Sequence, residues 1–499
     1  MRLWIGLCLP RLPLDVFLPN WSADTLCVVL EHEQVIALSP LAHTAGIKPG
    51  MRRAGALMLA PQARVHERSL EREERALQEV ALALLQYSPQ VASAEEATLL
   101  VDAGASLRLF GGVRALCRQI EASLRALGYT AVLSCAPTAR GAWLLAQGRA
   151  KAGAKSGRAL GMASLVRRLD GLPCALLPPA RPYLDWFDGI GCRTLGQLRH
   201  LPRPGLQRRC GAALLAMLDD AHGHGTELYA WLEAPPTFRA SLELFDRVEH
   251  ADALLFGARR LLQQMTGWLC ARQFAVERIQ LLLAHERGRV ARPPTVIDLA
   301  LGEAVWRDEH LLRLLKERLA QLVLEAPVIG LTLEALQVQP MAPPSESLFP
   351  EPGGTPQERQ RLMELLVARL GSDNVLQAVP RADYRPEAAN QWLPLPAKPA
   401  ARSAPPDLPP GLPGMPRPGW LLAQPVALLM REHRPFYGSP LKMVSVAERI
   451  EAGWWGQSQA RDYFIAEGLD HAHYWVYRER IAGSGEDAAP RWFLHGLFG

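Results

Sequence analysis

The first third of the chain alternates between strand-like and helix-like patterns of apolar residues. A nearly continuous apolar run opens the chain and predicts a buried strand, because a strand covered on both faces carries apolar side chains on both. Short apolar stretches then alternate with longer amphipathic ones. The predicted elements are a strand at 3–9, a hairpin at 26–30 and 34–38, a helix at 71–86, a strand at 131–135 and a helix at 139–148. This alternation is typical of the α/β fold class.

A second set of patterns occupies residues 240–340. Residues 276–284 form a strand-like run, and residues 308–324 have the spacing of an amphipathic helix. Residues 329–338 alternate between apolar and polar, as a half-buried strand does. These patterns predict a separate small domain that contains both strands and helix.

The last part of the chain begins with a predicted helix and turn at 356–389, followed by a linker at 393–418. Proline and alanine dominate the linker, which favours extended polyproline II backbone without a core. A module of short predicted strands follows. Its aromatic residues, together with Arg461, Arg478 and Arg480, would form either a surface that stacks single-stranded DNA or a small core. The aromatic residues are Trp454, Trp455, Tyr463, Phe464, Tyr474, Trp475 and Tyr477.

Composition limits the classes of protein that this chain can represent. With 499 residues, 49% hydrophobic and 21% charged, the chain is long enough for three or four ordinary globular domains. A net charge of +5 permits nucleic-acid binding without requiring it. The eight cysteines are scattered without a CxxC pair, which argues against zinc ribbons and a disulfide framework. No long apolar run predicts a membrane helix and no leader is evident, so we expect a cytoplasmic protein.

Candidate chemistry first emerges in residues 85–112, which end in SLRLFGG. This segment resembles the second palm segment of the Y-family, or lesion-bypass, DNA polymerases, which carry the run Ser-x-Asp-Glu-Ala-x-Leu-Asp. When the two runs are aligned on Asp102, Ala97 and Thr98 fall on the acidic pair. The family's other metal ligands end the first strand, where this chain has Leu7 and Leu9. The resemblance therefore implies a polymerase fold whose metal-ligand positions hold other residues.

These replacements matter because nucleotidyl transfer uses two Mg²⁺ ions held by oxygen ligands. Leucine and alanine supply no ligand, and Cys8 between the two leucines is a soft and poor Mg²⁺ partner. We therefore expect no catalytic residue, no metal and no cofactor. Glu95 and Glu96 lie two positions early, and a two-residue shift along a strand moves a carboxylate by roughly 7 Å. A bulge would bring one of them back, so an active lesion-bypass polymerase with relocated ligands stays an alternative.

A second motif follows at Gly189-Ile190-Gly191, in LDWFDGIGCRTLGQLRHLPRPGLQRRCG. It resembles the helix-hairpin-helix of the family's thumb, in which a Gly-x-Gly turn presents backbone N–H groups to a DNA phosphate. Thr194 stands where the second helix begins, as a cap or a phosphate contact. Arginines add sequence-independent attraction to DNA. The predicted DNA-binding residues are Gly189, Gly191, Arg193, Thr194, Arg208 and Arg209. The alternatives are an ordinary helical turn and, less favoured, a helix-hairpin-helix repair enzyme such as a glycosylase.

A third motif, Ser345-Glu346-Ser347-Leu348-Phe349, resembles the short peptide that binds the sliding clamp. Its usual form is Gln-Leu-Ser/Asp-Leu-Phe, so Ser347, Leu348 and Phe349 match and Ser345 replaces the glutamine. Neighbouring prolines keep the segment extended, and an extended peptide can place two apolar side chains in a pocket. The alternative is a Pro-rich linker with an incidental Leu-Phe pair.

Taken together, the pieces resemble the ImuB group, the catalytically inactive Y-family (UmuC/DinB-like) homologues of bacterial mutagenesis cassettes. The resemblance rests on LWIGLCLPRLPLD, SLRLFGG, Gly189–Gly191, RLGSDNV, DYRPE, ERIEAGWW, RDYF and WFLHGLFG. It implies a non-catalytic, DNA-bound and nucleoid-associated adaptor in damage-induced translesion synthesis. It also implies partners: primer-template and single-stranded DNA, the sliding clamp, a RecA-like protein of the ImuA type and an error-prone C-family polymerase of the ImuC type.

The same resemblance implies a right-hand, multi-domain α/β fold with a C-terminal extension. We expect palm and fingers at 1–168, a thumb with the helix-hairpin-helix at 169–238 and a little-finger-like domain, a small sheet with two helices, at 239–340. The clamp-binding peptide and linker would occupy 341–355, and a helical segment with the Pro-rich linker would occupy 356–418. A β-rich module that binds a partner or single-stranded DNA would form 419–499.

Overall fold

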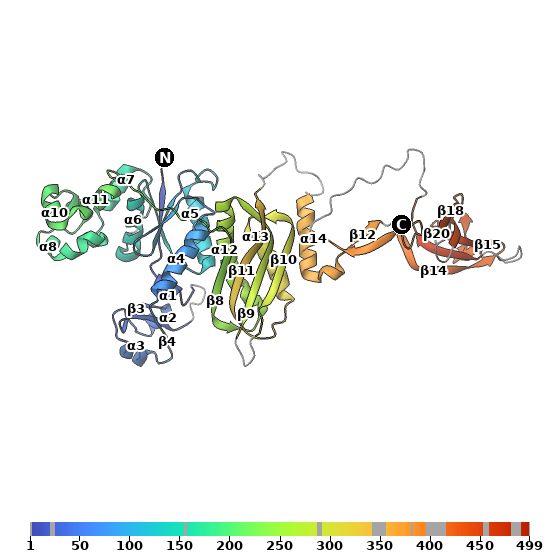
Figure 1. Ribbon diagram of the computed structural model, residues 1–499, viewed down its shortest axis with the longest axis horizontal. Coiled ribbons are helices and arrows are strands. Elements are labelled where there is room, and N and C mark those ends of the chain that lie inside the picture. Colours follow the sequence, from blue (N-terminus) through green and yellow to red (C-terminus); the bar gives the residue numbers. More distant parts are fainter. Residues whose placement is uncertain are drawn as a thin grey trace. The chain divides into compact units, whose positions relative to one another are not determined.

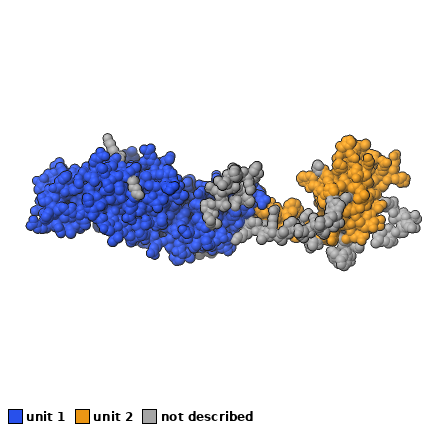
Figure 2. All heavy atoms as spheres, turned by 90° about the horizontal axis from the view of Figure 1, so that it is seen from above, with its two compact units in different colours: residues 1–369 blue, residues 370–499 orange. Residues whose placement is uncertain are grey.

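The computed structural model divides the chain into two compact units, residues 1–369 and 370–499 (Figures 1 and 2). Within the described residues, no helix combines the length and the apolar character needed to cross a membrane. The structure describes residues 2–19, 25–153, 157–286, 292–341, 356–380, 383–395, 416–452, 459–480 and 491–498.

Unit 1 begins with an antiparallel sheet in the strand order β5-β6-β1-β7. Helices α4 and α5 cover one face of this sheet and α6 covers the other (Figure 1). Strand β1 is buried along its whole length, as its continuous apolar run predicts. The bounds are β1 Trp4–Cys8, α4 Leu70–Leu84, β5 Val91–Ala94, β6 Thr98–Asp102, α5 Val113–Leu127, β7 Val132–Ala136 and α6 Ala139–Ala152. The elements predicted at 3–9, 71–86, 131–135 and 139–148 are therefore confirmed.

A small three-stranded sheet, β3-β2-β4, is inserted between β1 and α4. The hairpin predicted at 26–30 and 34–38 is confirmed, and β4 joins it in parallel. Ser39 caps the following short helix by accepting a hydrogen bond from the backbone N–H of Ala42. The bounds are α1 Leu12–Asp15, β2 Cys27–Glu31, β3 Gln34–Leu38, α2 Pro40–Thr44, α3 Arg53–Leu59 and β4 Arg64–Glu67.

A cluster of short helices follows the first sheet and shares a hydrophobic core with α6. Buried leucines and Phe187 fill this core, which fits the spacing of apolar residues in the predicted thumb. The bounds are α7 Met162–Asp170, the 3₁₀ helices η1 Cys174–Leu176 and η2 Pro178–Tyr183, α8 Leu184–Gly189, α9 Leu195–Arg199, α10 Arg203–Cys210 and α11 Ala212–Ala221.

A second four-stranded sheet, in the order β10-β9-β11-β8, packs against α12 and α13. This is the small sheet with two helices that the resemblance implied. Helix α14 reaches this domain through Glu364, which accepts a 2.7 Å hydrogen bond from the backbone N–H of Gly302. The bounds are β8 Arg239–Val248, η3 Ala251–Ala253, α12 Leu254–Arg272, β9 Phe274–His285, β10 Thr295–Val305, α13 Asp308–Ala320, β11 Val328–Pro340 and α14 Pro356–Leu370.

Helix α12 joins the two large sheets of unit 1, because its outer side packs on α4 and α5. Arg260 is nearly buried there, and its Nη2 lies 2.7 Å from Oε2 of Glu79. The same guanidinium donates to the hydroxyl of Tyr129. At Gly267 the backbones approach closely, since a Cβ would lie 1.9 Å from the carbonyl oxygen of Leu82. The ion pair between Arg260 and Glu79 and the close backbone contact of Gly267 with Leu82 thus hold the two sheets of unit 1 together.

Unit 2 contains a short hairpin, β12–β13, and an eight-stranded antiparallel sheet. Tyr463 and Trp475 are 0% exposed and Tyr477 is 4% exposed, and they pack around the buried ring of His495. For these three aromatic residues the core interpretation is confirmed and the stacking surface is wrong. The bounds are β12 Leu376–Pro380, β13 Asn390–Pro394, β14 Trp420–Arg431, β15 Arg434–Tyr437, β16 Ser439–Pro440, β17 Lys442–Met443, β18 Glu448–Ala452, β19 Gln459–Glu467, β20 His473–Arg480 and β21 Trp492–Leu497.

Candidate functional site

The first-strand positions predicted to replace metal ligands lie inside the core. Leu7 and Leu9 are 0% and 1% exposed and pack between the sheet and helices α4 and α5. Leu7 stands opposite Leu99 of β6 and Leu133 of β7. These positions therefore serve hydrophobic packing in this chain.

The hairpin between β5 and β6 holds the other predicted positions. Thr98 is fully buried as the first residue of β6, opposite Cys8. Its hydroxyl accepts a 2.8 Å hydrogen bond from Nε2 of Gln147 on α6 and donates to the carbonyl oxygen of Glu96. Ala97 contributes its carbonyl oxygen to the N–H of Leu9 at 2.9 Å. Burial raises the pKa of the Cys8 thiol, which keeps it neutral. The result is a neutral, internally hydrogen-bonded cluster that contains no carboxylate.

Glu95 and Glu96 both lie in the hairpin loop and are both paired with cationic side chains. The Nη1 of Arg140 lies 2.7 Å from Oε2 of Glu95. Glu96 is paired with Lys151 of α6, with Nζ 2.6 Å from Oε2, and also with Arg181 of η2. Burial alone would raise the pKa of Glu95, but the hydrogen bond from Arg140, a backbone hydrogen bond and the charge of Arg140 together outweigh burial and hold that pKa below its usual range.

The cationic side chains around the loop limit the ability of its two glutamates to bind a metal ion. Glu96 and Ala97 adopt positive φ values of 58° and 49°, so the loop turns tightly and directs the two glutamates to different partners. Glu95 bonds Arg140 at the start of α6, whereas Glu96 bonds Lys151 and Arg181. A cation entering here would have to displace a guanidinium or an ammonium group. Among the residues that the structure describes, no three His, Cys, Asp or Glu side chains are grouped as metal ligands would be.

The predicted helix-hairpin-helix is formed by α8 and α9, with Gly191 at φ +76° in the turn. Thr194 caps α9 in a capping box with Gln197. The Oε1 of Gln197 accepts from the backbone N–H groups of Arg193 and Thr194 at 2.8 and 3.1 Å. The N–H of Gly191 donates to the carbonyl of Asp188, at the end of α8. The backbone donors that were expected to meet a phosphate are therefore already bonded within the hairpin.

The arginines around the hairpin are exposed and only loosely tied. The Nε of Arg193 lies 3.5 Å from Asp188, and both side chains are largely exposed. Arg208 donates to the carbonyl oxygen of Pro204, and Arg209 lies over the ring of Trp186 at 4.6 Å. Such contacts leave the guanidinium charges available to a polyanion, since exposed ion pairs are weak. The arginines, rather than the glycine turn, are therefore the groups of the hairpin that stay free for a polyanion.

The N-terminus of helix α6 is occupied by an acidic side chain of the chain itself. The carboxylate of Glu227 accepts hydrogen bonds from the backbone N–H groups of Ala139 and Arg140, at 2.9 and 2.5 Å. An anion at a helix N-terminus is stabilised by the exposed N–H groups and the helix dipole. This chain supplies that anion from its own sequence.

The chain is similar to known proteins over most of its length. Residues 19–147, about a quarter of the chain, match the model of the impB/mucB/samB family. Two proteins called Protein ImuB, from the NA1000/CB15N and ATCC 19089/CB 15 strains of Caulobacter vibrioides, are each 28% identical over 478 residues. The alignment covers 91% of this chain and 100% of each relative. The predicted resemblance to the ImuB group is confirmed. With the topology above, the predicted fold class, a multi-domain α/β chain with a UmuC-like domain and a C-terminal β module, is confirmed as well.

Solved structures of Dbh DNA polymerase are also similar to this chain. An insertion ternary complex has a TM-score of 0.37 and a post-insertion binary complex has one of 0.36, each with 15% sequence identity. They cover 66% and 67% of this chain and 98% of the polymerase chain.

Several residues of the site were not predicted from the sequence. Gln147, Lys151 and Arg181 hold the hairpin loop, yet they lie 49 to 85 positions away from their partners in β6 and the loop. No local motif marks them. The clamp-peptide residues Ser345, Ser347, Leu348 and Phe349, like Trp454 and Trp455, lie outside the described residues.

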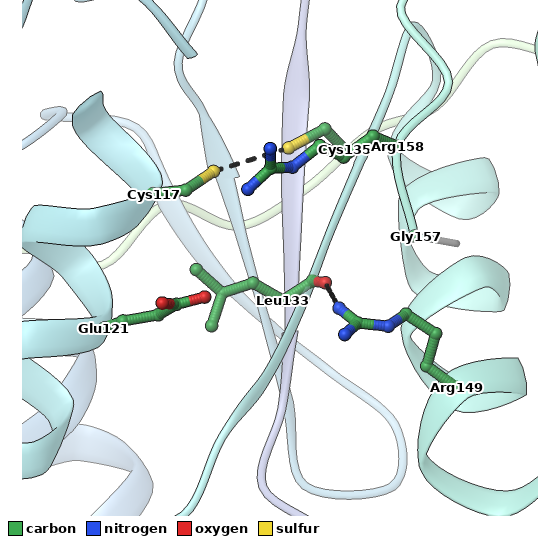
Figure 3. Close-up of a pocket in the computed structure, with 7 residues that line it drawn as sticks. All are labelled: Cys117, Glu121, Leu133, Cys135, Arg149, Gly157 and Arg158. Carbon is green, nitrogen blue, oxygen red and sulfur yellow. Dashed lines mark hydrogen bonds between the residues drawn. The ribbon is translucent and has the colours of Figure 1, made fainter. Parts of the chain in front are cut away.

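A cavity of about 240 Å³ opens at β7, an edge strand of the first sheet, and is lined by Cys117 and Glu121 of α5 on one side and by Arg149, Gly157 and Arg158 on the other (Figure 3). The sulfur atoms of Cys117 and Cys135 lie 3.6 Å apart on its wall, with Arg158 beside them. The hydrogen bond between the thiols lowers the pKa of Cys117 and, with burial, raises that of Cys135. None of the residues that line the cavity was predicted to bind metal or DNA.

Proposed function

We propose that this chain is a non-catalytic, DNA-binding adaptor in damage-induced translesion synthesis and mutagenesis. The observation that carries this proposal is the pairing of Glu95 and Glu96 with Arg140, Lys151 and Arg181. Two-metal catalysis needs carboxylates that are free to bind Mg²⁺, and here cationic side chains occupy them. The buried leucines of the first strand support the same conclusion, because leucine provides no second set of metal ligands.

DNA binding in this proposal rests on the thumb. Arg193, Arg208 and Arg209 surround the α8–α9 hairpin, and their charge would attract phosphates without regard to sequence. The ImuB resemblance supports a role on DNA, since it extends over most of the chain. The adaptor would be cytoplasmic and nucleoid-associated.

The adaptor function also needs partners, and these rest on the sequence. Leu348 and Phe349 would fill an apolar pocket on the sliding clamp, with Ser347 beside them and Ser345 in the place of the usual glutamine. The resemblance adds a RecA-like protein of the ImuA type and an error-prone C-family polymerase of the ImuC type. In this arrangement the chain brings a synthesising polymerase to the clamp at a damaged site.

The competing proposal, an active polymerase with relocated ligands, is tested by primer extension with Mg²⁺ and with Mn²⁺. We expect no template-dependent incorporation by the purified full chain. Incorporation that Glu95→Ala or Glu96→Ala abolishes would overturn the adaptor proposal. The double variant Lys151→Ala, Arg181→Ala is tested in the same primer-extension assay. It frees the Glu96 carboxylate without adding a ligand on the first strand.

DNA binding is tested separately with primer-template DNA at several salt concentrations. Reversing the charge of Arg193 and Arg208 should reduce the slope of log affinity against log salt by about 2, because each duplex phosphate contact contributes about 0.9. Reversing Arg114 and Arg118, exposed on α5, removes equal charge and should have less effect. Gln197→Ala frees the N–H groups of Arg193 and Thr194, so tighter binding would show that the backbone of the hairpin can also hold phosphate.

A further inference from the structure

A buried aspartate gathers three arginines on one face of the large sheet of unit 2. Asp462 of β19 is 1% exposed, and its oxygens lie 2.9 Å from Arg449, 2.9 Å from Arg478 and 3.0 Å from Arg480. Arg449 and Arg478 stand directly opposite Asp462 in β18 and β20. Arg480 follows two residues later, so it projects from the same face. We call these four residues the Asp462 arginine cluster.

The cluster carries more positive charge than its carboxylate requires. Each guanidinium has five N–H donors, and the contact with Asp462 occupies one nitrogen of each. Burial alone would raise the pKa of Asp462, but the hydrogen bonds from the arginines outweigh it and lower that pKa to about 2. Asp462 is therefore ionised at any physiological pH, and the cluster keeps a net charge of two. Arg449 and Arg480 are about half exposed, at 49% and 51%.

Two aromatic rings lie beside the cluster on the same face. Trp492 of β21 is the cross-strand partner of Arg478, whose guanidinium lies 6.0 Å from the centre of its ring. Phe464 lies two residues beyond Asp462 on β19, and its ring centre is 5.3 Å from that of Trp492. Both rings are partly exposed, in contrast to the buried aromatics of the opposite face. Their inner edges pack against a small core that contains Val476 and Leu494, which holds the rings in place. Cationic side chains thus adjoin a small aromatic platform.

We propose that this face of unit 2 binds single-stranded nucleic acid. Arg449 and Arg480 would hold backbone phosphates, and a base would stack on Trp492 and Phe464. Arginine forks match phosphate geometry, and aromatic rings accept any base, so the combination is typical of sequence-tolerant single-strand binding. An acidic polypeptide would use the arginines but has no need for the rings, which is why the nucleic acid is the favoured occupant.

A purely structural role explains the cluster less well. One arginine would be enough to neutralise Asp462. Neutralisation therefore does not explain the other two positive charges, and Arg449 and Arg480 are each about half exposed. Glu451 of β18 is an acidic residue close to the proposed phosphate site. It pairs with Ala460 of β19, which pairs on its other side with Arg480, so Glu451 and Arg480 lie on the same face of the sheet. The charge of Glu451 opposes an incoming phosphate. Removing that charge should therefore strengthen binding, an effect that misfolding cannot imitate.

The test measures binding of the full chain to fluorescent oligo(dT) of roughly 20 nucleotides. The protein carries Arg193→Glu and Arg208→Glu throughout, so that the thumb contributes little. We expect Arg449→Ala with Arg480→Ala to lower affinity and to reduce the slope of log affinity against log salt by about 1.4, at about 0.7 per phosphate contact. Arg431→Ala with Arg434→Ala removes equal charge from the β14–β15 hairpin of the same unit and should leave the slope nearly unchanged.

Two further variants separate nucleic acid from other occupants. Glu451→Gln should increase affinity for oligo(dT), and Trp492→Leu should decrease it by about fivefold or more, as expected for one lost base stack. An iodouracil-containing oligonucleotide should crosslink to the peptide that carries Trp492. The proposal is overturned if the two arginine pairs behave alike, if no crosslink maps to β21, or if polyglutamate competes as well as oligo(dT) while Trp492→Leu has no effect.

Discussion

Replacing Leu7 with aspartate tests whether the first sheet of this chain can be returned to a metal-binding state. The resemblance places a metal ligand at this position, but Leu7 is fully buried against Leu99 and Leu133. We expect Leu7→Asp to destabilise unit 1 rather than to create a metal site. The physical reason is that the new carboxylate enters an apolar core, where its charge loses hydration.

The size of the effect follows from the burial of Leu7. Losing a fully buried leucine costs about 2–3 kcal/mol, and burying a carboxyl group without a hydrogen bond costs about 1–3 kcal/mol even when it is protonated. Each unit by which the folded pKa rises above about 3.9 adds about 1.4 kcal/mol at neutral pH. Even a rise of about one unit brings the total to roughly 6 kcal/mol, which is comparable to the whole stability of many domains, about 5–15 kcal/mol.

The pH dependence identifies the buried charge as the cause. A carboxyl group whose pKa is raised by folding destabilises the folded state least below about pH 4, and progressively more as the pH rises toward its folded pKa. Thermal melting of wild type, Leu7→Asp and Leu7→Asn is therefore compared at about pH 5 and about pH 8, with and without Mg²⁺. Asparagine has nearly the same shape but does not titrate, so its deficit should be the same at both pH values.

One outcome would refute this reasoning. If Leu7→Asp melts together with wild type at the higher pH and gains stability from Mg²⁺, then position 7 reaches solvent and a second carboxylate. In that case the core described around β1 would be wrong, and the alternative of an active polymerase with relocated ligands would be favoured.

Three other predictions concern different parts of the chain. Gly267→Ala should destabilise unit 1 by about 1–3 kcal/mol in thermal or chemical denaturation, because its Cβ would overlap the carbonyl of Leu82, whereas Gly55→Ala in the open helix α3 should be neutral or stabilising. The arginines lower the pKa of Asp462 to about 2 from its ordinary value of 3.8, so its stabilisation of unit 2 should be lost as the pH falls from about 4 to about 2, and Asp462→Asn should remove that loss in a fluorescence titration. Leu348→Ala with Phe349→Ala should weaken clamp binding by about 2–4 kcal/mol in a direct binding assay without changing the melting temperature, and equal binding would make the peptide a linker.

Strands of the two large sheets of unit 1 were predictable where burial gives the apolar residues a regular spacing along the chain. The run at 3–9 appears as β1 and the alternation at 329–338 as β11, because a covered strand and a half-covered strand have distinct patterns. Helix α12 was missed. Thirteen of its residues are buried, since it packs on a sheet with one side and on α4 and α5 with the other, and such a helix lacks a polar stripe.

The candidate site was only half predictable. The fixed spacing of the family's acidic run predicted Ala97 and Thr98, and the end of the first apolar strand predicted Leu7 and Leu9, as the positions that replace metal ligands. The pairing of Glu96 with Arg181 joins residues 85 positions apart, and only the folded chain brings them together. The aromatic residues of unit 2 pose a related problem, since alternation along a strand shows that two faces exist but not which face another layer covers.

At three places in unit 1, polar groups that could bind a ligand are paired with the chain's own side chains. Lys151 and Arg181 are paired with Glu96. The side chain of Gln197 takes the backbone N–H groups of the hairpin, and that of Glu227 takes those at the start of α6. A buried or partly buried polar group is costly when it is left without a partner, so a site that loses its ligand is stable only if the protein supplies a substitute. Internal pairing at all three places supports the proposal that this fold serves binding and assembly rather than nucleotide chemistry.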